Sequence, residues 1–160
     1  MLSILHRRRL LMILTSCLAY EKCSGGLCQP TTDSKIKFEE NKRKIIFLNP
    51  EHQEYKRVQV DGCAINDKQT MRCDKLLVSA DEHEERYVEL KGTEVMHAID
   101  QLESTIVRLG EFEDNRHAYV ISTNVAPAYT TKIQQKALYF KKRYRSELVV
   151  REKQLEVALY

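Results

Sequence analysis

Residues 86–125 hold an apolar strand, an amphipathic helix and a second apolar strand in close succession, and this order constrains the fold most. The helix is predicted over 93–110, TEVMHAIDQLESTIVRLG, where Thr93 can cap the first turn and Gly110 can end the last in a left-handed conformation. One continuous apolar stripe runs along it: Val95, Ala98, Ile99, Leu102, Ile106 and Leu109. Strands joined through a crossing helix lie parallel in one sheet, so this helix should pack on the face of a sheet.

Shorter apolar runs before this unit are separated by turns and predict antiparallel strands. They are KIIFLN (44–49), RVQVDGCAI (57–65), CDKLLVSA (73–80) and, after a charged turn at 80–86, RYVELKG (86–92). We expect a loop over 23–34 and a charged patch over 38–44.

After the strand RHAYVISTNV (116–125), a second helix is predicted over about 130–142, followed by short strands in LVVRE and QLEVAL. The predicted fold class is therefore α/β, with a mixed central sheet flanked by helices.

Length and composition fit one domain. A chain of 160 residues, 42% apolar and 31% charged, can bury one core. We divide it into an N-terminal helix and loop, residues 1–35, and an α/β domain, residues 36–160. The net charge of +3 permits a polyanionic partner without requiring one, so an argument for nucleic acid depends on where the charges lie.

The N-terminal segment 6–19, HRRRLLMILTSCLA, is open to two interpretations. A basic start before an apolar run is typical of a signal peptide, and LTSC at 14–17 fits a bacterial lipoprotein box. The apolar run of about ten residues is too short to span a bilayer, and its leucines recur at helical spacing. We favour an amphipathic helix in a cytoplasmic protein with no stable membrane span. The alternative is export or membrane tethering through this segment.

The five cysteines, at positions 17, 23, 28, 63 and 73, contain no C-x-x-C pair. A chain that can bury a core needs no disulfide framework, so we expect mostly reduced, intracellular thiols. Cys63 and Cys73 bracket a connection between two predicted strands and can lie close together. Buried small hydrophobic side chains are favoured there over a disulfide or metal pair.

Charged residues interrupt the apolar strands at Asp74, Glu89 and Lys91. Alternate side chains of a strand share a face, so Glu89 and Lys91 point the same way, and the turn between the strands lets Asp74 approach them. Two neighbouring carboxylates repel unless a proton or a divalent cation lies between them, and oxygen ligands suit Mg²⁺, with Mn²⁺ as a substitute. A nearby ammonium can hold the attacking water or neutralise charge on a phosphorane, which is the chemistry of phosphodiester hydrolysis.

The pattern D-x(14)-E-L-K-G, on two strands directly before a helix, resembles the PD-(D/E)XK, or restriction-endonuclease-like, nuclease superfamily. The wider stretch VQVDGCAI…MRCDKLLV…YVELKGTEVMHAIDQLEST is similar to small uncharacterised bacterial proteins with ELKG and H-A-x-x-Q-L signatures. The resemblance covers residues 44–125 well and the termini poorly, and residue 73 is Cys where the family name has Pro.

The resemblance implies a restriction-endonuclease-like fold and a Mg²⁺-dependent endonuclease. Asp74 and Glu89 would hold the metal, with the Leu90 carbonyl as a further ligand, and Lys91 would position the water. DNA is favoured over RNA as substrate, in phage defence or a mobile element. A homodimer or a protein partner is expected to supply specificity, because no base-reading module is present.

The resemblance also suggests polar residues outside this trio. Some family members carry a glutamine near the catalytic lysine, which Gln101 matches, and His97 is its neighbour on the helix surface. A solvated helix face is the competing interpretation, and for His97 the favoured one. Many members carry a glutamate before the first core strand, for which the candidates are Glu21, Glu39 and Glu40. Asp61 is either an accessory acid or, as we favour, a turn residue.

Two basic clusters, NKRK (41–44) and KKRYR (141–145), could guide a nucleic-acid backbone. The second cluster supplies the candidate contacts Lys141, Lys142, Arg143 and Arg145. A solvated face is the commoner reason for such a charge run. The alternative function is a non-catalytic subunit of the same fold that binds or scaffolds a larger complex.

Overall fold

The computed structural model describes residues 28–80, 84–110 and 115–160, which form two sheets and two helices. The larger sheet has the order β1-β4-β5-β6-β7-β8. Its strands are β1 (Cys28–Thr31), β4 (Tyr55–Gln59), β5 (Lys75–Ser79), β6 (Glu84–Lys91), β7 (Asn115–Ser122) and β8 (Ser146–Glu152). The smaller sheet, in the order β2-β3-β9, contains β2 (Lys35–Glu40), β3 (Arg43–Leu48) and β9 (Gln154–Ala158). The helical elements are α2 (Val95–Leu109), the 3-10 turn η1 (Pro127–Tyr129) and α3 (Thr130–Tyr144).

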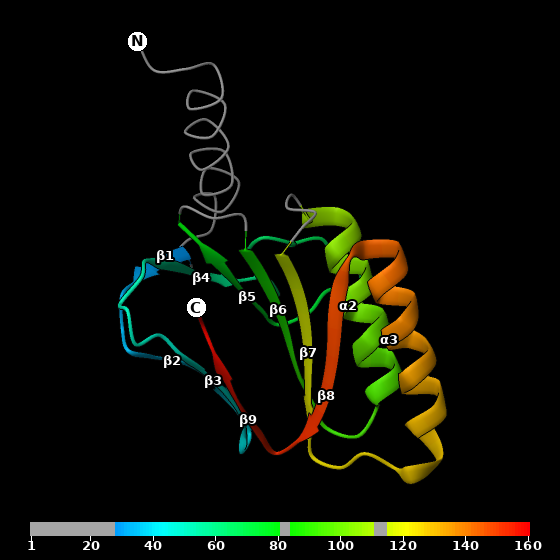
Figure 1. Ribbon diagram of the computed structural model, residues 1–160. Coiled ribbons are helices and arrows are strands. Elements are labelled where there is room, and N and C mark those ends of the chain that lie inside the picture. The colour runs from blue at the N-terminus through cyan, green and yellow to red at the C-terminus, as the bar shows by residue number, and fades with distance from the viewer. Residues whose placement is uncertain (1–27, 81–83, 111–114) are drawn as a thin grey trace.

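These elements stack in three layers, with α2 and α3 on one face of the larger sheet and the smaller sheet on the other (Figure 1). Strands β1, β4, β5 and β6 pair antiparallel, whereas β6, β7 and β8 are parallel. Successive right-handed crossovers in one direction across a sheet put both helices on the same face. The predicted mixed α/β architecture is therefore confirmed, but the helices cover only one face of the sheet.

Two hydrophobic cores follow from this layering. The core beneath the helices contains Tyr87 of β6, and the core between the sheets contains Val88 and Leu90. Because side chains alternate along a strand, Glu89 and Lys91 share the face of Tyr87, as predicted, and this face is the one that the helices cover.

The predicted helix is present as α2, and its apolar stripe is buried: Val95, Ala98, Ile99, Leu102 and Ile106. The predicted N-cap is wrong, because Glu94 and not Thr93 is the N-cap, and it makes no side-chain capping bond. Gly110 ends the helix as predicted, but with φ −62° and ψ 115° it is extended and not left-handed. Position 110 needs glycine because neighbouring atoms leave no room for a side chain. A Cβ there would lie 2.5 Å from the Ile106 carbonyl oxygen and 2.7 Å from Arg116 Nη2.

The stretch expected to be a charged patch, 38–44, forms the turn end of the β2–β3 hairpin. Asn41 and Lys42 both have positive φ, 47° and 66°, as the two central residues of a tight hairpin turn require. Glu40 pairs with Arg43 across that turn, while Phe38 is buried between the sheets. The prediction of a loop over 23–34 is wrong at residues 28–31, which form β1 and pair with β4 at the edge of the larger sheet.

The acidic turn predicted at 80–86 is shorter than expected, because β6 already begins at Glu84. Glu84, Glu85 and Arg86 are all buried. Arg86 Nε bonds Glu84 Oε1, and Arg116 Nε of β7 lies 2.9 Å from Glu85 Oε2. The sequence predicts a solvated turn here because the other partners of this charged run, Tyr55, Arg116 and Tyr119, lie 29, 31 and 33 residues away in sequence.

Among the cysteines that the structure describes, Cys63 differs from expectation. Cys73 is a buried free thiol, as predicted, and does not pair with Cys63. Cys63 is disulfide-bonded, so the expectation of reduced thiols is wrong there. Cys17, Cys23 and the segment 6–19 lie outside the described residues. Neither helix of the described ranges combines the length and apolarity needed to cross a membrane.

Candidate functional site

The carboxyl end of β6 and the start of β5 bring Asp74 and Glu89 together. Asp74 Oδ2 accepts a hydrogen bond from the backbone N–H of Leu90 at 2.8 Å, so its carboxylate lies against the β6 backbone between Glu89 and Lys91. Glu89 is only 2% exposed, and its Oε2 has no hydrogen-bond partner among the described residues. A buried carboxylate oxygen without a donor is costly, which makes Glu89 Oε2 an unsatisfied point of the site.

The two carboxylates interact electrostatically. Burial raises the pKa of Glu89 to about 8, and the Asp74 charge acts in the same direction. The Lys91 ammonium opposes that rise in the pKa of Glu89, so both Asp74 and Lys91 act on Glu89. Burial also raises the pKa of Asp74, while the Leu90 N–H opposes the rise. Such a pair favours either a shared proton or a bound cation.

Lys91 is half-buried at the end of β6, where it pairs with Ser122 of β7. The next residue, Gly92, accepts hydrogen bonds at its carbonyl from Ser122 Oγ at 2.6 Å and from the Thr123 backbone N–H at 2.8 Å. These bonds fix the chain directly after Lys91, so the lysine is carried on well-ordered backbone.

The β2–β3 hairpin contributes two residues to the same edge. Arg43 Nη1 donates to Thr123 Oγ1 at 3.1 Å and lies 3.8 Å from where a Cβ at Gly92 would be. The charge of Glu40 raises the pKa of Asp74. Of the three candidate glutamates, Glu40 is therefore the one near the pair. Glu39 is ion-paired with Lys37 at 2.7 Å, and Glu21 lies outside the described residues.

Asp61 lies close enough to raise the pKa of both Asp74 and Glu89. Its Oδ1 bonds Arg72 Nε at 2.6 Å, so its own charge is partly balanced. Asp61 follows β4 in a turn, as predicted, and also belongs to the acidic surroundings of the pair.

Helix α2 holds the chain that leads into Asp74. Thr105 Oγ1 accepts a bond from the Cys73 N–H at 2.8 Å and donates to the Gln101 carbonyl at 2.8 Å. Gln101 Nε2 donates to the Arg72 carbonyl at 3.0 Å, and its Oε1 is buried without a partner in the described part of the chain. Gln101 thus braces the backbone beside the carboxylates. Thr105 was not foreseen, because a threonine inside a helix gives no sequence signal for such a contact.

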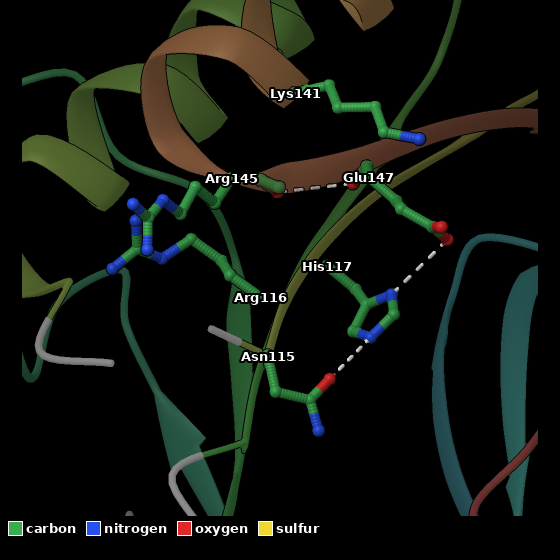
Figure 2. Close-up of a pocket in the computed structure, with 7 residues that line it drawn as sticks. Asn115, Arg116, His117, Lys141, Arg145 and Glu147 are labelled. Carbon is green, nitrogen blue, oxygen red and sulfur yellow. Dashed lines mark hydrogen bonds and ion pairs between the residues drawn. The ribbon is translucent and has the colours of Figure 1, made fainter. Parts of the chain in front are cut away.

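The remaining predicted residues are dispersed. His97, Lys142 and Arg143 are exposed on their helices. Lys141 and Arg145 line a pocket at the opposite end of β7 from Lys91 (Figure 2). The structure therefore unites Asp74, Glu89, Lys91 and, through backbone contacts, Leu90 and Gln101, but not the basic cluster 141–145.

Within the described residues, no set of three or more His, Cys, Asp or Glu side chains is arranged to hold a metal ion. Mg²⁺ does not need such a set, because it commonly takes one or two carboxylates and keeps water and phosphate oxygens as its other ligands. The unpartnered Glu89 oxygen beside Asp74 fits that donor pattern.

Comparisons of the chain with protein-family models, curated proteins and solved structures found no match.

Proposed function

We propose that this protein is a metal-dependent nuclease that hydrolyses phosphodiester bonds, with DNA favoured over RNA. The observation that carries the proposal is the buried Glu89 carboxylate, with an unpartnered oxygen, next to Asp74 and Lys91. Two carboxylates with raised pKa values beside an ammonium cost folding free energy, because they are removed from water. Such groups are concentrated at functional sites.

Asp74 and Glu89 are the side chains that would hold Mg²⁺ or Mn²⁺, with the Leu90 carbonyl as a further ligand. When bound, the cation would supply charge neutralisation for a phosphodiester. The protein's part is to hold the two carboxylates rigid. The Leu90 N–H fixes Asp74, and Thr105 and Gln101 fix the backbone that leads into it.

Lys91 would act on the reacting groups. Its ammonium already interacts with Glu89 and stands at the end of β6, beside the exposed Thr123. There it can hold the attacking water or stabilise negative charge that develops on the phosphorus oxygens. Arg43 lies on the other side of Gly92 and could add a contact to a neighbouring phosphate.

The order of elements around the site supports the same assignment. The acid opens the middle strand of the meander β4-β5-β6, the E-x-K residues end the third strand, and α2 crosses to the parallel strand β7. The restriction-endonuclease-like fold, a partner or second copy for specificity, and a role in phage defence or a mobile element belong to this proposal.

The alternative is a non-catalytic subunit that uses the same fold for binding. The lack of a third acidic or imidazole donor among the described residues favours it. Cleavage would exclude it, whereas metal-independent binding without cleavage would support it.

The cellular compartment is proposed to be the cytoplasm. The Cys63 disulfide favours the alternative of export or membrane tethering, because disulfides persist mainly in oxidising compartments. Cell fractionation with thiol alkylation distinguishes the two, since a cytoplasmic protein would carry a reduced Cys63.

The test incubates the purified chain with plasmid, linear and single-stranded DNA and with RNA, in Mg²⁺, Mn²⁺ or EDTA. Asp74→Asn and Lys91→Ala should lose cleavage, whereas Asp33→Asn and Lys132→Ala, exposed residues away from the site, should retain it. Calorimetric titration with Mn²⁺ is the second measurement, because it detects the metal site even if cleavage needs a partner. No cleavage together with equal Mn²⁺ affinity in wild type and Asp74→Asn would refute the proposal.

A further inference from the structure

Strand β8 ends the larger sheet, and no strand of the described ranges pairs with its outer side. Its centre reads LVV, and Leu148, Val149 and Val150 are all half-buried. Leu148 and Val150 border the core beneath the helices, and Val149 borders the core between the sheets. An apolar edge strand is a template for pairing with another chain unless the protein blocks it.

The other sheet edges carry features that oppose such pairing. β1 has four residues and includes Pro30, which has no N–H to donate. β2 carries the exposed lysines Lys35 and Lys37. β9 has five residues, and pairing it antiparallel with itself over its full length would set Glu156 against Glu156. β8, with seven residues, contains no proline and no charge at its centre.

The hydrogen bonds of β8 indicate which of its backbone groups face outward. β7 and β8 are parallel, and the Lys153 N–H donates to the Ser122 carbonyl at 2.8 Å. Because backbone groups alternate sides along a strand, the odd residues from 147 to 153 face β7, whereas the N–H and C=O of Leu148 and Val150 face away. The Val150 carbonyl accepts a bond from the adjacent Arg151 side chain at 2.9 Å rather than from a strand.

The sequence of β8 is complementary to itself when it is read in the opposite direction. In an antiparallel pair centred on Val149, Leu148 meets Val150 and Glu147 meets Arg151. This register joins the outward-facing residues of one strand to those of the other, as the antiparallel hydrogen-bond pattern requires. Two-fold symmetry makes each contact twice, so the pair gains two Glu147–Arg151 contacts and sets no like charges opposite each other.

Both charged side chains are exposed at this edge. Glu147 Oε2 lies 3.6 Å from His117 Nδ1 (Figure 2). Burial lowers the pKa of His117, so its ring is mainly neutral at pH 7 and does not hold the carboxylate as a cation. Arg151 forms no ion pair with any described residue. Glu147 and Arg151 can therefore exchange their present contacts for each other.

Helix α3 adds an exposed apolar side chain beside the edge. Lys136 of α3 lies 3.3 Å from Asp100 and 3.4 Å from Glu103 of α2, so its flank of the helix faces α2. Leu138 lies about 200° round the helix from Lys136, on the flank away from α2, and is 63% exposed. A two-fold pair at β8 would place the α3 of both copies on the same face of the joined sheet, where each Leu138 can lose exposed area.

We propose that β8 pairs antiparallel with β8 of a second copy of this chain, about a two-fold axis at Val149. A second copy is the partner because the edge matches its own sequence in charge and in hydrogen-bond pattern. Lys91 is in register with Ser122, and Ser122 with Glu152 at the carboxyl end of β8. The symmetry therefore puts the two candidate sites toward opposite ends of the joined sheet. Use of this dimer for nuclease specificity rests on the proposed function, whereas the contact itself does not.

Sedimentation velocity of the full chain over a concentration series, in EDTA, measures the dissociation constant of the dimer. Glu147→Arg and Arg151→Glu each set like charges opposite each other twice, and each should weaken the dimer at least about tenfold. The double variant Glu147→Arg/Arg151→Glu restores opposite charges and should dimerise nearly as wild type does. Glu156→Arg, on the β9 edge, is the matched control and should leave the dissociation constant unchanged. Circular dichroism checks that each variant is folded.

Cysteine cross-linking tests the register. Two Val149→Cys residues on the axis would have Cα atoms about 4.5 Å apart, within the range of a disulfide. Leu148→Cys and Val150→Cys would lie diagonally, at about 7–8 Å, and should cross-link much less under mild oxidation. Wild type, which keeps its native cysteines, gives the background.

A wild type that sediments as a monomer at every concentration would overturn the inference and leave the edge to a segment of another protein. A dimer that both single charge reversals leave intact, or that Glu156→Arg weakens instead, would also overturn it. Asp74→Asn and Lys91→Ala should dimerise as wild type does, because both residues lie away from β8. Failure of the dimer is therefore separable from failure of the nuclease proposal.

Discussion

The Asp74 carboxylate accepts a hydrogen bond from the backbone N–H of Leu90, the residue between Glu89 and Lys91. Strand β6 thus supplies the Glu89 carboxylate, the Leu90 amide donor and the Lys91 ammonium around the Asp74 carboxylate at the start of β5. The bond fixes Asp74 and does nothing for Glu89, whose Oε2 stays without a donor within the described residues. Glu89 is therefore the group whose ionisation should dominate the pH dependence of this edge.

In EDTA, the free energy of unfolding should fall as the pH rises from about 4.5 to about 8. Glu89 ionises near 4.5 when unfolded and near 8 when folded, so in that window the folded state holds a proton that the unfolded state has lost. The loss should be on the order of a few kcal/mol. Urea unfolding across this range measures it, and Glu89→Gln should flatten the slope. An unchanged slope in the variant would contradict the assignment.

Thr105→Val should destabilise the protein by roughly 1–3 kcal/mol, because it leaves the buried Cys73 N–H without its acceptor. Mn²⁺ affinity should also fall, since Asp74 follows Cys73 directly. Thr105→Ser retains the hydroxyl and should keep metal affinity near the wild-type value. If the serine and valine variants bind Mn²⁺ equally, the hydroxyl does not position Asp74.

Glu40→Gln should lower the pKa of Asp74, because the Glu40 charge raises it. Glu39→Gln is the matched control, since Glu39 is exposed and paired with Lys37. Carboxyl NMR titration of Asp74 in the three proteins makes the measurement. A shift of equal size in both variants would mean that the β2–β3 hairpin acts on the site only through the general field of the protein.

Arg86→Met should cost roughly 3–5 kcal/mol of folding free energy, because it leaves Glu84 charged and buried. Among the described side chains, Tyr55 donates a hydrogen bond to Glu84 Oε2 at 3.0 Å and would remain as the partner of that carboxylate. The double variant Glu84→Gln/Arg86→Met should recover most of the loss in thermal unfolding. A double variant no more stable than Arg86→Met would show that the arginine acts through packing instead.

The parts of the fold with a strong local pattern could be predicted from the sequence. The α2 stripe is one, and the alternation at Tyr87, Val88 and Leu90 is another. The β2–β3 hairpin was missed because its turn residues, Asn41 and Lys42, include no glycine and stand among charges. The start of β6 was missed because the partners that Glu84, Glu85 and Arg86 have outside the run come from other strands.

The candidate site likewise contains residues whose proximity could be predicted from the sequence and residues whose contribution could not. Asp74, Glu89 and Lys91 could be predicted because one turn joins their strands, so local spacing controls their approach. Arg43 and Thr105 could not be foreseen as contributors, because their contacts span 80 and 32 residues. Lys141 and Arg145 share a sequence cluster with Lys142 and Arg143, yet of the four only Lys141 and Arg145 line the pocket. The helix distributes residues 141–143 around its axis, and Arg145 follows its end as the left-handed C-cap.

Glu40 lies on the smaller sheet and Asp74 on the larger one, and this separation has a consequence for folding. Its influence on Asp74 exists only after the two sheets have packed, a contact between segments that are far apart in sequence and therefore slow to meet. Closing the sandwich brings like charges together, so the packing of the two sheets works against their repulsion. A cation that binds at this edge would accordingly slow unfolding more than it speeds the early steps of folding.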